Sequence, residues 1–304
     1  CISNVFEYLH FFVIVKRMIV GHQRNLRYLE RVLANGMLAH AYLFHGPEAV
    51  GKRAVAMAVA ETLLCSGQRG NGLGNPAPVR ADRTPTAAGG LGGCHGCEGC
   101  RLVASGTHPD LIFLSFEHLL VEEDLKRGIG IKNIHELQRL LALAPWRGGR
   151  RIVVIDGADA LSREAQTALL KTLEEPQSST VFFLITDRPS ALLPTIHSRS
   201  ISLGFTPVAD EEIMPLIAGA SPARGKSILA FAAGRPGLAL RLAREEDFFN
   251  AFREREAEFT NVFRADLSDQ LLFSEEAGAA KSRASERAAP ARAEKTPKNA
   301  SRAP

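Results

Sequence analysis

The sequence predicts an α/β protein with a parallel sheet. Short apolar segments alternate with segments of helical periodicity, and two of the apolar segments, 151–155 (RIVVI) and 180–186 (TVFFLIT), are apolar almost throughout. Runs of this kind are typical of strands that are covered on both faces. Another apolar segment, 41–45 (AYLFH), leads through a glycine-containing turn into a helical segment. Strands that alternate with helices form a parallel sheet, which binds ligands at the carboxyl ends of its strands.

The individual elements follow from apolar spacing and from residues that begin or end helices. Gly36 ends a first helical period, while Ser162 is the expected N-cap of a helix that Pro176 terminates. We expect strands at 41–45, 111–115, 151–155 and 180–186. We expect helices at 21–35, 53–64, 131–144, 162–175, 190–198, 210–218, 224–233, 237–243 and 245–263. The change from strands to helices after Phe205 indicates a separate, all-helical region.

Composition excludes several classes of protein. With 304 residues, 45% of them hydrophobic, the chain is long enough for two or three domains of about 100–200 residues each. It has no uncharged apolar stretch long enough to span a membrane. The apolar segment 5–15 is short, is followed rather than preceded by basic residues, and lacks a cleavage site, so we expect no signal peptide and a cytoplasmic protein.

Charge is concentrated at the end of the chain. Of a net charge of +4, the segment 274–304 contributes most, with seven Lys and Arg against four Glu. Its Ala-, Lys- and Pro-rich composition predicts a disordered basic tail. Since the rest of the chain is nearly neutral, charge alone does not indicate a nucleic-acid-binding surface.

A phosphate-binding loop is predicted between the strand 41–45 and the next helix. Residues 46–52 (GPEAVGK) fit the pattern G-x-x-x-x-G-K, in which Gly46 and Gly51 allow backbone N–H groups to turn inward and Lys52 reaches the phosphates. The next residue is usually Ser or Thr, whose hydroxyl holds Mg²⁺. Here it is Arg53, which cannot ligate a cation. A glycine-rich turn that binds nothing is therefore the alternative interpretation.

The acid that matches this loop is Asp156, at the end of the strand 151–155. In ATP-hydrolysing proteins of this layout the next residue is usually Glu, which orients the attacking water, but here it is Gly157. We expect Asp159 to face elsewhere. Phosphoryl transfer depends on positioning and charge neutralisation. We therefore expect an ATPase framework that does not catalyse.

Cysteines predict a metal site. Cys94, Cys97 and Cys100 have the spacing of two overlapping C-x-x-C turns, and Cys65 lies at the end of the helix expected after the phosphate-binding loop. Four thiolates suit tetrahedral Zn²⁺ and leave no open position, so we expect a structural zinc. Buried free thiols are the alternative. The intervening segment 66–93 is glycine-rich and predicts a flexible insertion.

Four stretches together resemble one known family. These are 39–53 (AHAYLFHGPEAVGKR), 94–100 (CHGCEGC), 168–176 (ALLKTLEEP) and 193–200 (LPTIHSRS). They are similar to the delta-prime family of bacterial DNA polymerase III clamp-loader subunits, which are AAA+ proteins, over about 20–243. The resemblance implies a RecA-like AAA+ P-loop module with a zinc-binding insertion, then a small helical lid and a helical collar segment. The domains implied are an N-terminal extension (1–17), the RecA-like domain (18–204, insertion 65–100), the lid (205–244), a short, partial collar (245–273) and the tail (274–304).

The resemblance also implies residue roles. Ser198-Arg199-Ser200 stands where the family has Ser-Arg-Cys, which would make Arg199 an arginine finger that acts in trans on a neighbouring subunit's nucleotide. Thr186 matches the sensor position, and Gly237 lies where ATP-hydrolysing members have a lid arginine. These changes imply a subunit that is ATPase-deficient and binds ATP weakly or not at all. For Arg199, a helix-end salt bridge is the alternative role.

The implied function is to help load the sliding clamp onto primed DNA in chromosomal replication. The implied partners are the gamma/tau and delta subunits, the sliding clamp and primed DNA, with the protein at the nucleoid during replication. Three alternatives remain open at this point: a hydrolysing gamma/tau-type ATPase subunit, an unrelated P-loop kinase or transferase, and a zinc-stapled structural adaptor.

Overall fold

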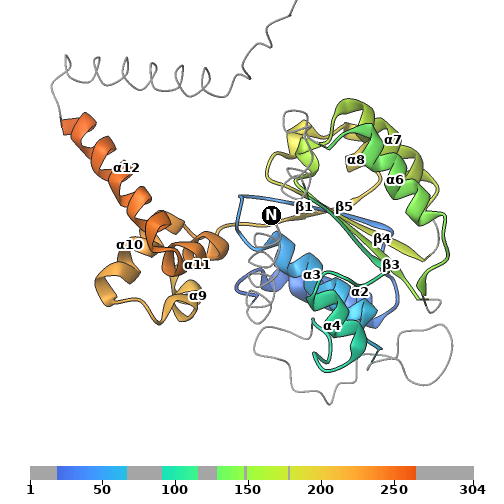
Figure 1. Cartoon of the computed structure of the whole chain (residues 1–304), viewed down its shortest axis with the longest axis horizontal. Coiled ribbons are helices and arrows are strands. Elements are labelled where there is room, and N and C mark those ends of the chain that lie inside the picture. The colour runs from blue at the N-terminus through green and yellow to red at the C-terminus, as the bar shows by residue number, and fades with distance from the viewer. Residues whose placement is uncertain (1–18, 67–90, 116–128, 147–148, 177–178, 265–304) are drawn as a thin grey trace, which may run out of the picture. The chain divides into compact units, whose positions relative to one another are not determined.

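The computed structural model describes residues 19–66, 91–115, 129–146, 149–176 and 179–264 (Figure 1). The expected N-terminal extension, most of the zinc insertion between its cysteines and the basic tail lie outside these residues. The chain divides after Arg244 into two compact units, Cys1–Arg244 and Glu245–Pro304. The finer domain boundaries given above remain a prediction.

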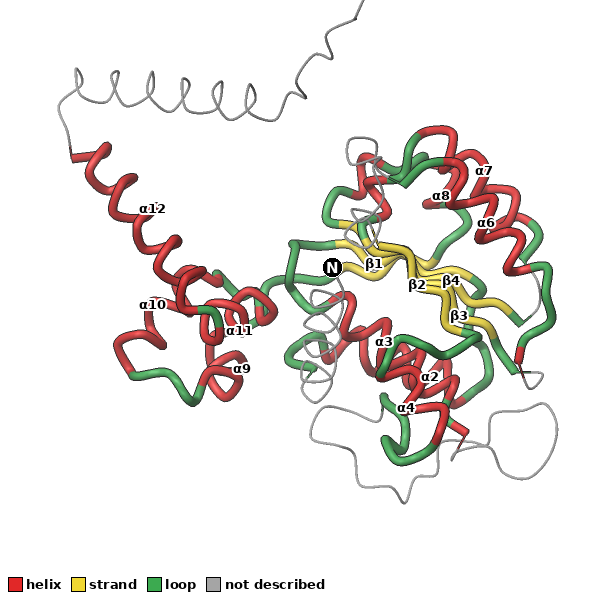
Figure 2. Tube along the Cα trace, in the orientation of Figure 1, coloured by secondary structure: helices red, strands yellow, loops and turns green. Residues whose placement is uncertain are grey.

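The first unit contains one five-stranded sheet in which every neighbouring pair is parallel (Figure 2). Its strand order is β2-β3-β4-β1-β5. The strands are β1 (Ala41–His45), β2 (Leu111–Ser115), β3 (Arg151–Asp156), β4 (Thr180–Thr186) and β5 (Ile201–Gly204). The expected parallel α/β sheet is thus confirmed. The edge strand β5 was not expected from the sequence, because most of its side chains are exposed.

Helices cover both faces of the sheet (Figure 1). On one face lie α2 (Gln23–Ala34), α3 (Lys52–Leu64) and α4 (Glu98–Ala104), and on the other lie α6 (Ile131–Leu141), α7 (Arg163–Glu174) and α8 (Pro194–His197). Successive residues of β4 point to opposite faces, as strand geometry requires. Val181, Phe183 and Ile185 join the core beneath α2 and α3, whereas Phe182 and Leu184 join the core beneath α6 and α7.

Two helical segments differ from expectation. The helix expected at 190–198 is a 3₁₀ turn, η4 (Pro189–Ala191), followed by α8. Leu193 between them is extended, with ψ 140°, because a following proline disfavours the helical conformation. The short helix α4 was not expected. It begins after Cys97, whose sulfur accepts a hydrogen bond from the Cys100 N–H and so serves as the N-cap.

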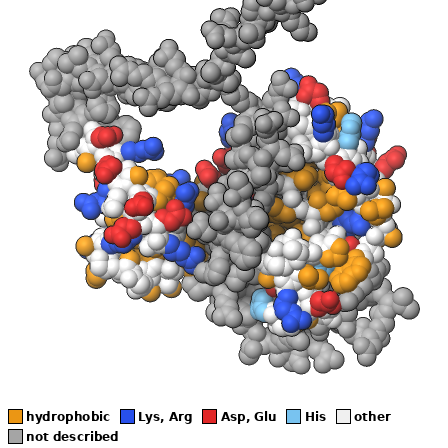
Figure 3. All heavy atoms as spheres, viewed as in Figure 1, with side chains coloured by type: hydrophobic (Ala, Val, Ile, Leu, Met, Phe, Trp, Pro, Cys, Tyr) orange, Lys and Arg blue, Asp and Glu red, His pale blue; other side chains and the backbone are white. Residues whose placement is uncertain are grey.

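The elements that follow β5 in the described part of the chain are all helical. The first unit continues with α9 (Asp210–Ile213), η5 (Met214–Ile217), α10 (Pro222–Ala232) and α11 (Pro236–Arg244), and the second unit contains α12 (Glu246–Arg264). In the part of the chain that the structure describes, no helix is both long and apolar enough to cross a membrane. On the face in view in Figure 3, basic and acidic side chains are interspersed rather than gathered into one basic patch.

Candidate functional site

The predicted phosphate-binding loop lies between β1 and α3, at the carboxyl end of the sheet. Gly46 and Gly51 have φ values of 145° and 117°, which are accessible to glycine but strained for other residues. A Cβ on Gly46 would collide with the Phe205 carbonyl oxygen. The buried Lys52 Nζ donates hydrogen bonds to the carbonyl oxygens of Gly46 (2.5 Å) and Pro47 (2.6 Å). The ammonium is thus bound by the loop itself.

Arg53 is bound to Asp156, the acid that was expected to match the phosphate-binding loop. Its Nε donates a hydrogen bond to Asp156 Oδ2, and the two side chains are 32% and 14% exposed. The guanidinium carbon also lies 5.6 Å from the centre of the Phe113 ring, a cation–π distance. The positive charge that contacts Asp156 is therefore supplied by an arginine side chain of this protein.

Thr186 and Asp159 are bound to each other at the ends of β4 and β3. The Thr186 hydroxyl donates to Asp159 Oδ1 (2.9 Å), and Arg188 donates to Asp159 Oδ2 through Nε (3.0 Å) and Nη2 (2.7 Å). Burial is the largest single influence on the Asp159 carboxyl and would raise its pKa, but the hydrogen bonds that the carboxylate accepts and the positive charge of Arg188 lower the pKa on balance. The predicted sensor hydroxyl is thus committed to an internal acceptor.

The first turn of α11 contacts the phosphate-binding loop. The N–H of Gly237 donates to the Ala49 carbonyl oxygen at 2.8 Å. A Cβ at position 237 would lie only 2.8 Å from the same oxygen, closer than Cβ atoms normally approach. Glycine therefore permits this contact, and an arginine at this position would displace the helix from the loop.

The four predicted zinc ligands converge. The sulfur atoms of Cys65, Cys94, Cys97 and Cys100 all lie within 4.8 Å of one another, and those of Cys65 and Cys97 are 3.7 Å apart. A tetrahedral zinc with Zn–S bonds of about 2.3 Å has sulfur–sulfur edges of about 3.8 Å. The cysteines therefore fit a zinc ion, which the structure, holding no ligands, does not contain.

Hydrogen bonds around these sulfurs also suit thiolates. The backbone N–H of Cys94 donates to Cys65 Sγ (3.3 Å), and that of Cys100 donates to Cys97 Sγ (3.4 Å). The Cys100 thiol, the largest influence, and the Cys94 N–H hold the pKa of Cys65 below its ordinary value, against the opposing effect of burial. The same pairing with Cys65, together with burial, raises the pKa of the Cys100 thiol. Of these two groups it is therefore Cys65 whose anionic form, the form that binds a metal, is favoured.

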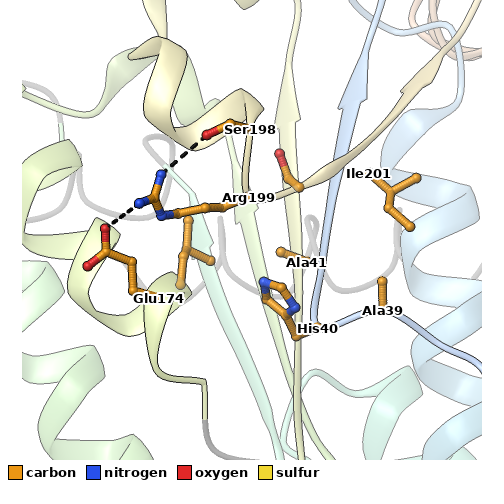
Figure 4. A pocket seen from close by; sticks show the side chains of 9 residues that line it. Ala39, His40, Ala41, Glu174, Ser198, Arg199 and Ile201 are labelled. Atoms are coloured by element: carbon orange, nitrogen blue, oxygen red, sulfur yellow. Dashed lines mark hydrogen bonds and ion pairs between the residues drawn. The ribbon is translucent and has the colours of Figure 1, made fainter.

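Arg199 lies at the amino ends of the strands, whereas the loop follows the carboxyl end of β1. It follows α8 and precedes β5, beside an open pocket of about 630 Å³ that the starts of β1 and β5 and the end of α7 line (Figure 4). Its Nη2 forms an ion pair with Glu174 Oε1 at 2.6 Å, and its Nη1 donates to Thr195 O (3.1 Å) and Ser198 Oγ (3.2 Å). The sequence did not reveal Glu174 as a partner, because 24 residues intervene in the chain.

The structure thus forms two groups from the predicted site residues. Lys52, Asp156 and Thr186 gather at the carboxyl ends of parallel strands, where the sheet is expected to bind ligands. Arg199 is separated from them by the length of β1, five residues, or about 16 Å at the usual rise per residue. The zinc cysteines lie away from both groups, between the end of α3 and the start of α4.

Comparison with known proteins identifies the family. The family model described as DNA polymerase III, delta subunit, matches residues 21–209, more than half of the chain. The chain belongs to this DNA polymerase III delta-subunit family. The parallel sheet and the glycine loop between β1 and α3 agree with the α/β P-loop module that the resemblance implied.

Members named delta-prime are among its relatives. DNA polymerase III subunit delta' of Pseudomonas aeruginosa is 32% identical over 240 residues, which cover 78% of this chain and 64% of the relative. That of Bacillus subtilis is 30% identical over 192 residues, or 62% of this chain and 49% of the relative. The chain thus spans less than two thirds of the length of these curated relatives. The expected resemblance to delta-prime is confirmed.

Tau subunits of DNA polymerase III are also similar to this chain. That of Escherichia coli is 32% identical over 195 residues, which cover 64% of this chain and 26% of the relative. Among solved structures, a gamma subunit-related protein of Thermotoga maritima aligns with a TM-score of 0.45 at 19% identity, covering 72% of this chain and 57% of that one. This structural similarity is too low to assign any role to a residue.

Proposed function

We propose that this chain is the delta-prime subunit of the DNA polymerase III clamp loader. It would assemble with the gamma/tau and delta subunits, help to load the sliding clamp onto primed DNA, and leave ATP hydrolysis to its neighbours. Its own contribution to hydrolysis would be Arg199, supplied in trans. Family membership supports the assignment, and the geometry of the two charged sites supports the division of labour.

The lack of hydrolysis in cis rests on the phosphate-binding loop. The Arg53 guanidinium binds Asp156, where an active enzyme would place Mg²⁺ near a carboxylate. Gly157 supplies no carboxylate for the attacking water, and Gly237 supplies no lid cation. Each change removes a group that phosphoryl transfer needs within the same chain.

The action in trans rests on one observation, the position of Arg199. It lies at the amino ends of the strands, whereas Lys52 follows the carboxyl end of β1. Across a separation of about 16 Å, the guanidinium is out of reach of any phosphate bound to its own loop. Its side chain is one-third exposed, so it is accessible to a phosphate that another chain holds.

Zinc would be structural in this proposal. Cys65 ends α3 and Cys97 caps α4, so an ion bound by the four sulfurs ties these two helices together. With four protein ligands it has no free position for substrate. This role does not depend on nucleotide.

The test is reconstitution with gamma/tau and delta subunits, followed by ATPase and clamp-loading assays on primed DNA. Arg199→Ala should lower hydrolysis at the neighbouring site by about 10³-fold, as loss of an arginine finger does, while leaving assembly intact. Arg139→Ala is the matched control, because that arginine is exposed and pairs only with Glu136 among the described side chains. Unchanged hydrolysis and loading in the Arg199→Ala complex would refute the mechanism.

The same complex discriminates the gamma/tau-type alternative. A hydrolysing subunit would depend most on Lys52, which contacts phosphates in active P-loops. We expect Lys52→Ala to leave ATP turnover by the complex nearly unchanged, because in this proposal the loop of this chain does not hydrolyse ATP. A larger loss from Lys52→Ala than from Arg199→Ala would favour a hydrolysing subunit instead.

A further inference from the structure

We propose that Glu174 is a positioning residue for Arg199. This inference rests on the proposed function, since it assigns to Glu174 the task of holding the arginine finger ready for a phosphate on a neighbouring chain. Glu174 is the last residue of α7, and its Oε1 lies 2.6 Å from Arg199 Nη2. Figure 4 shows the guanidinium between this carboxylate and Ser198.

Three contacts fix the guanidinium from two sides. Thr195 O and Ser198 Oγ bind Nη1 from the helix that precedes Arg199, and Glu174 binds Nη2 from α7. An arginine side chain has several rotatable bonds, so ordering it only when the phosphate arrives would cost conformational entropy. Contacts made beforehand remove part of that cost from the catalytic step.

The contacts leave donors for an incoming anion. A guanidinium carries five N–H donors; in the described part of the chain Nη1 donates two hydrogen bonds and Nη2 forms the ion pair with Glu174. The Nε–H has no hydrogen-bond partner among the described residues. Together with Nη2 it forms the side of the planar group that can bind two oxygens of a phosphate. Glu174 thus contacts the arginine while the Nε–H stays available to an anion.

Solvent exposure limits how much the removal of Glu174 can lower the rate of ATP hydrolysis. The Glu174 side chain is 48% exposed, and exposed ion pairs contribute only modestly because water screens them. We therefore expect the rate of ATP hydrolysis by the complex to fall about two- to fivefold when Glu174 is removed. The exposure also means that substitution should leave the fold intact.

The adjacent acid offers a matched control. Glu175 is the next residue, but it lines a different pocket, beside Gln138 and Lys171. Glu174→Ala and Glu175→Ala remove the same charge from neighbouring positions. An effect of bulk charge would appear in both variants, whereas positioning would appear only in the first.

The decisive measurement is a double-mutant cycle in the reconstituted complex. Glu174→Ala should lower single-turnover ATP hydrolysis two- to fivefold by the estimate above, Glu174→Gln should lose less because its amide oxygen still accepts a hydrogen bond, and Glu175→Ala should lose nothing. In an Arg199→Ala background, Glu174→Ala should have no further effect. An unchanged or faster rate in Glu174→Ala, or an equal loss with and without Arg199, would overturn the proposal.

A second measurement on the free chain separates this inference from the arginine-finger function. Nitrogen-15 NMR of arginine side chains reports rotation of the guanidinium. We expect rotation of Arg199 to be slowed in the wild type and to become faster in Glu174→Ala but not in Glu175→Ala. Equal rotation in all three would overturn the positioning role. If Arg199→Ala leaves hydrolysis unchanged while rotation responds to Glu174, it is the trans mechanism that fails.

Discussion

Replacing Arg53 by threonine tests the proposal that Arg53 keeps the phosphate-binding loop from holding a metal ion. The substitution returns the hydroxyl that active loops use to hold Mg²⁺ and removes the guanidinium bound to Asp156. We expect the variant to bind ATP in a Mg²⁺-dependent way and more tightly than the wild type does. Hydrolysis is not expected, because Gly157 still supplies no carboxylate.

Two opposing effects set the magnitude. Asp156 is 14% exposed and loses its partner, so the cost should lie between about 1 kcal/mol for an exposed pair and about 3–5 kcal/mol for a buried one. Against this, MgATP at ten times its dissociation constant stabilises the native state by about 1.4 kcal/mol. For a unit of about 200 residues this raises Tm by about 3–5 °C. The variant should thus melt earlier without ligand and respond more strongly to it.

Thermal unfolding with ATP alone, Mg²⁺ alone and both together measures these shifts. Arg53→Met is the matched control, since it also removes the charge beside Asp156 but offers no hydroxyl. We expect the combined ligands to raise Tm of the Arg53→Thr chain only. An equal Mg²⁺-dependent shift in Arg53→Met, or in the wild type, would show that the missing hydroxyl is not what limits binding.

Three further predictions concern stability and metal. Cys97→Ser should lower zinc from one ion per chain, measured by elemental analysis of protein purified without added metal, and should lower Tm. Arg151→Met should cost about 3–5 kcal/mol in urea unfolding, because this buried arginine pairs with the buried Asp110 and bonds three carbonyl oxygens at the end of α6; Arg139→Ala, at an exposed pair, should cost under about 1 kcal/mol. Gly237→Ala should destabilise, because overpacking of about 1–3 kcal/mol against the Ala49 carbonyl exceeds the gain of about 1 kcal/mol in helix propensity; a gain in urea stability would contradict the contact.

Most of the sheet could be predicted because burial leaves a local trace in the sequence. The strands β3 and β4 are covered on both faces, which requires continuous apolar runs. β5 has no such trace, because its side chains are largely exposed and pairing with β1 alone places it. The break before α8 was missed although Pro194 marks it, since the apolar period of the segment outweighed the restriction that proline imposes on the preceding residue.

In the candidate sites, too, some groupings could be predicted from the sequence and others could not. The glycine loop and the three clustered cysteines are recognisable from spacing, because neighbouring residues carry the geometry. The pairs Arg53–Asp156 and Glu174–Arg199 join residues that are 103 and 25 positions apart. Sequence indicated that Arg53 could not hold a metal, but not that it would bind the carboxylate of Asp156. Only the order of the strands places Asp156 within its reach.

Gly157 differs from Arg53 in what a substitution would have to change. The contact of Arg53 with Asp156 is made by a side chain, whereas the backbone of Gly157, with φ 79° and ψ 47°, lies in the left-handed region, where a non-glycine residue costs about 1–2 kcal/mol. A glutamate there would have free space for its Cβ, but it would be strained in the conformation from which the turn Ala158–Ala160 holds Asp159 against Thr186. We therefore expect Gly157→Glu to lower the free energy of unfolding by about 1–2 kcal/mol, a backbone cost that Arg53→Thr does not carry.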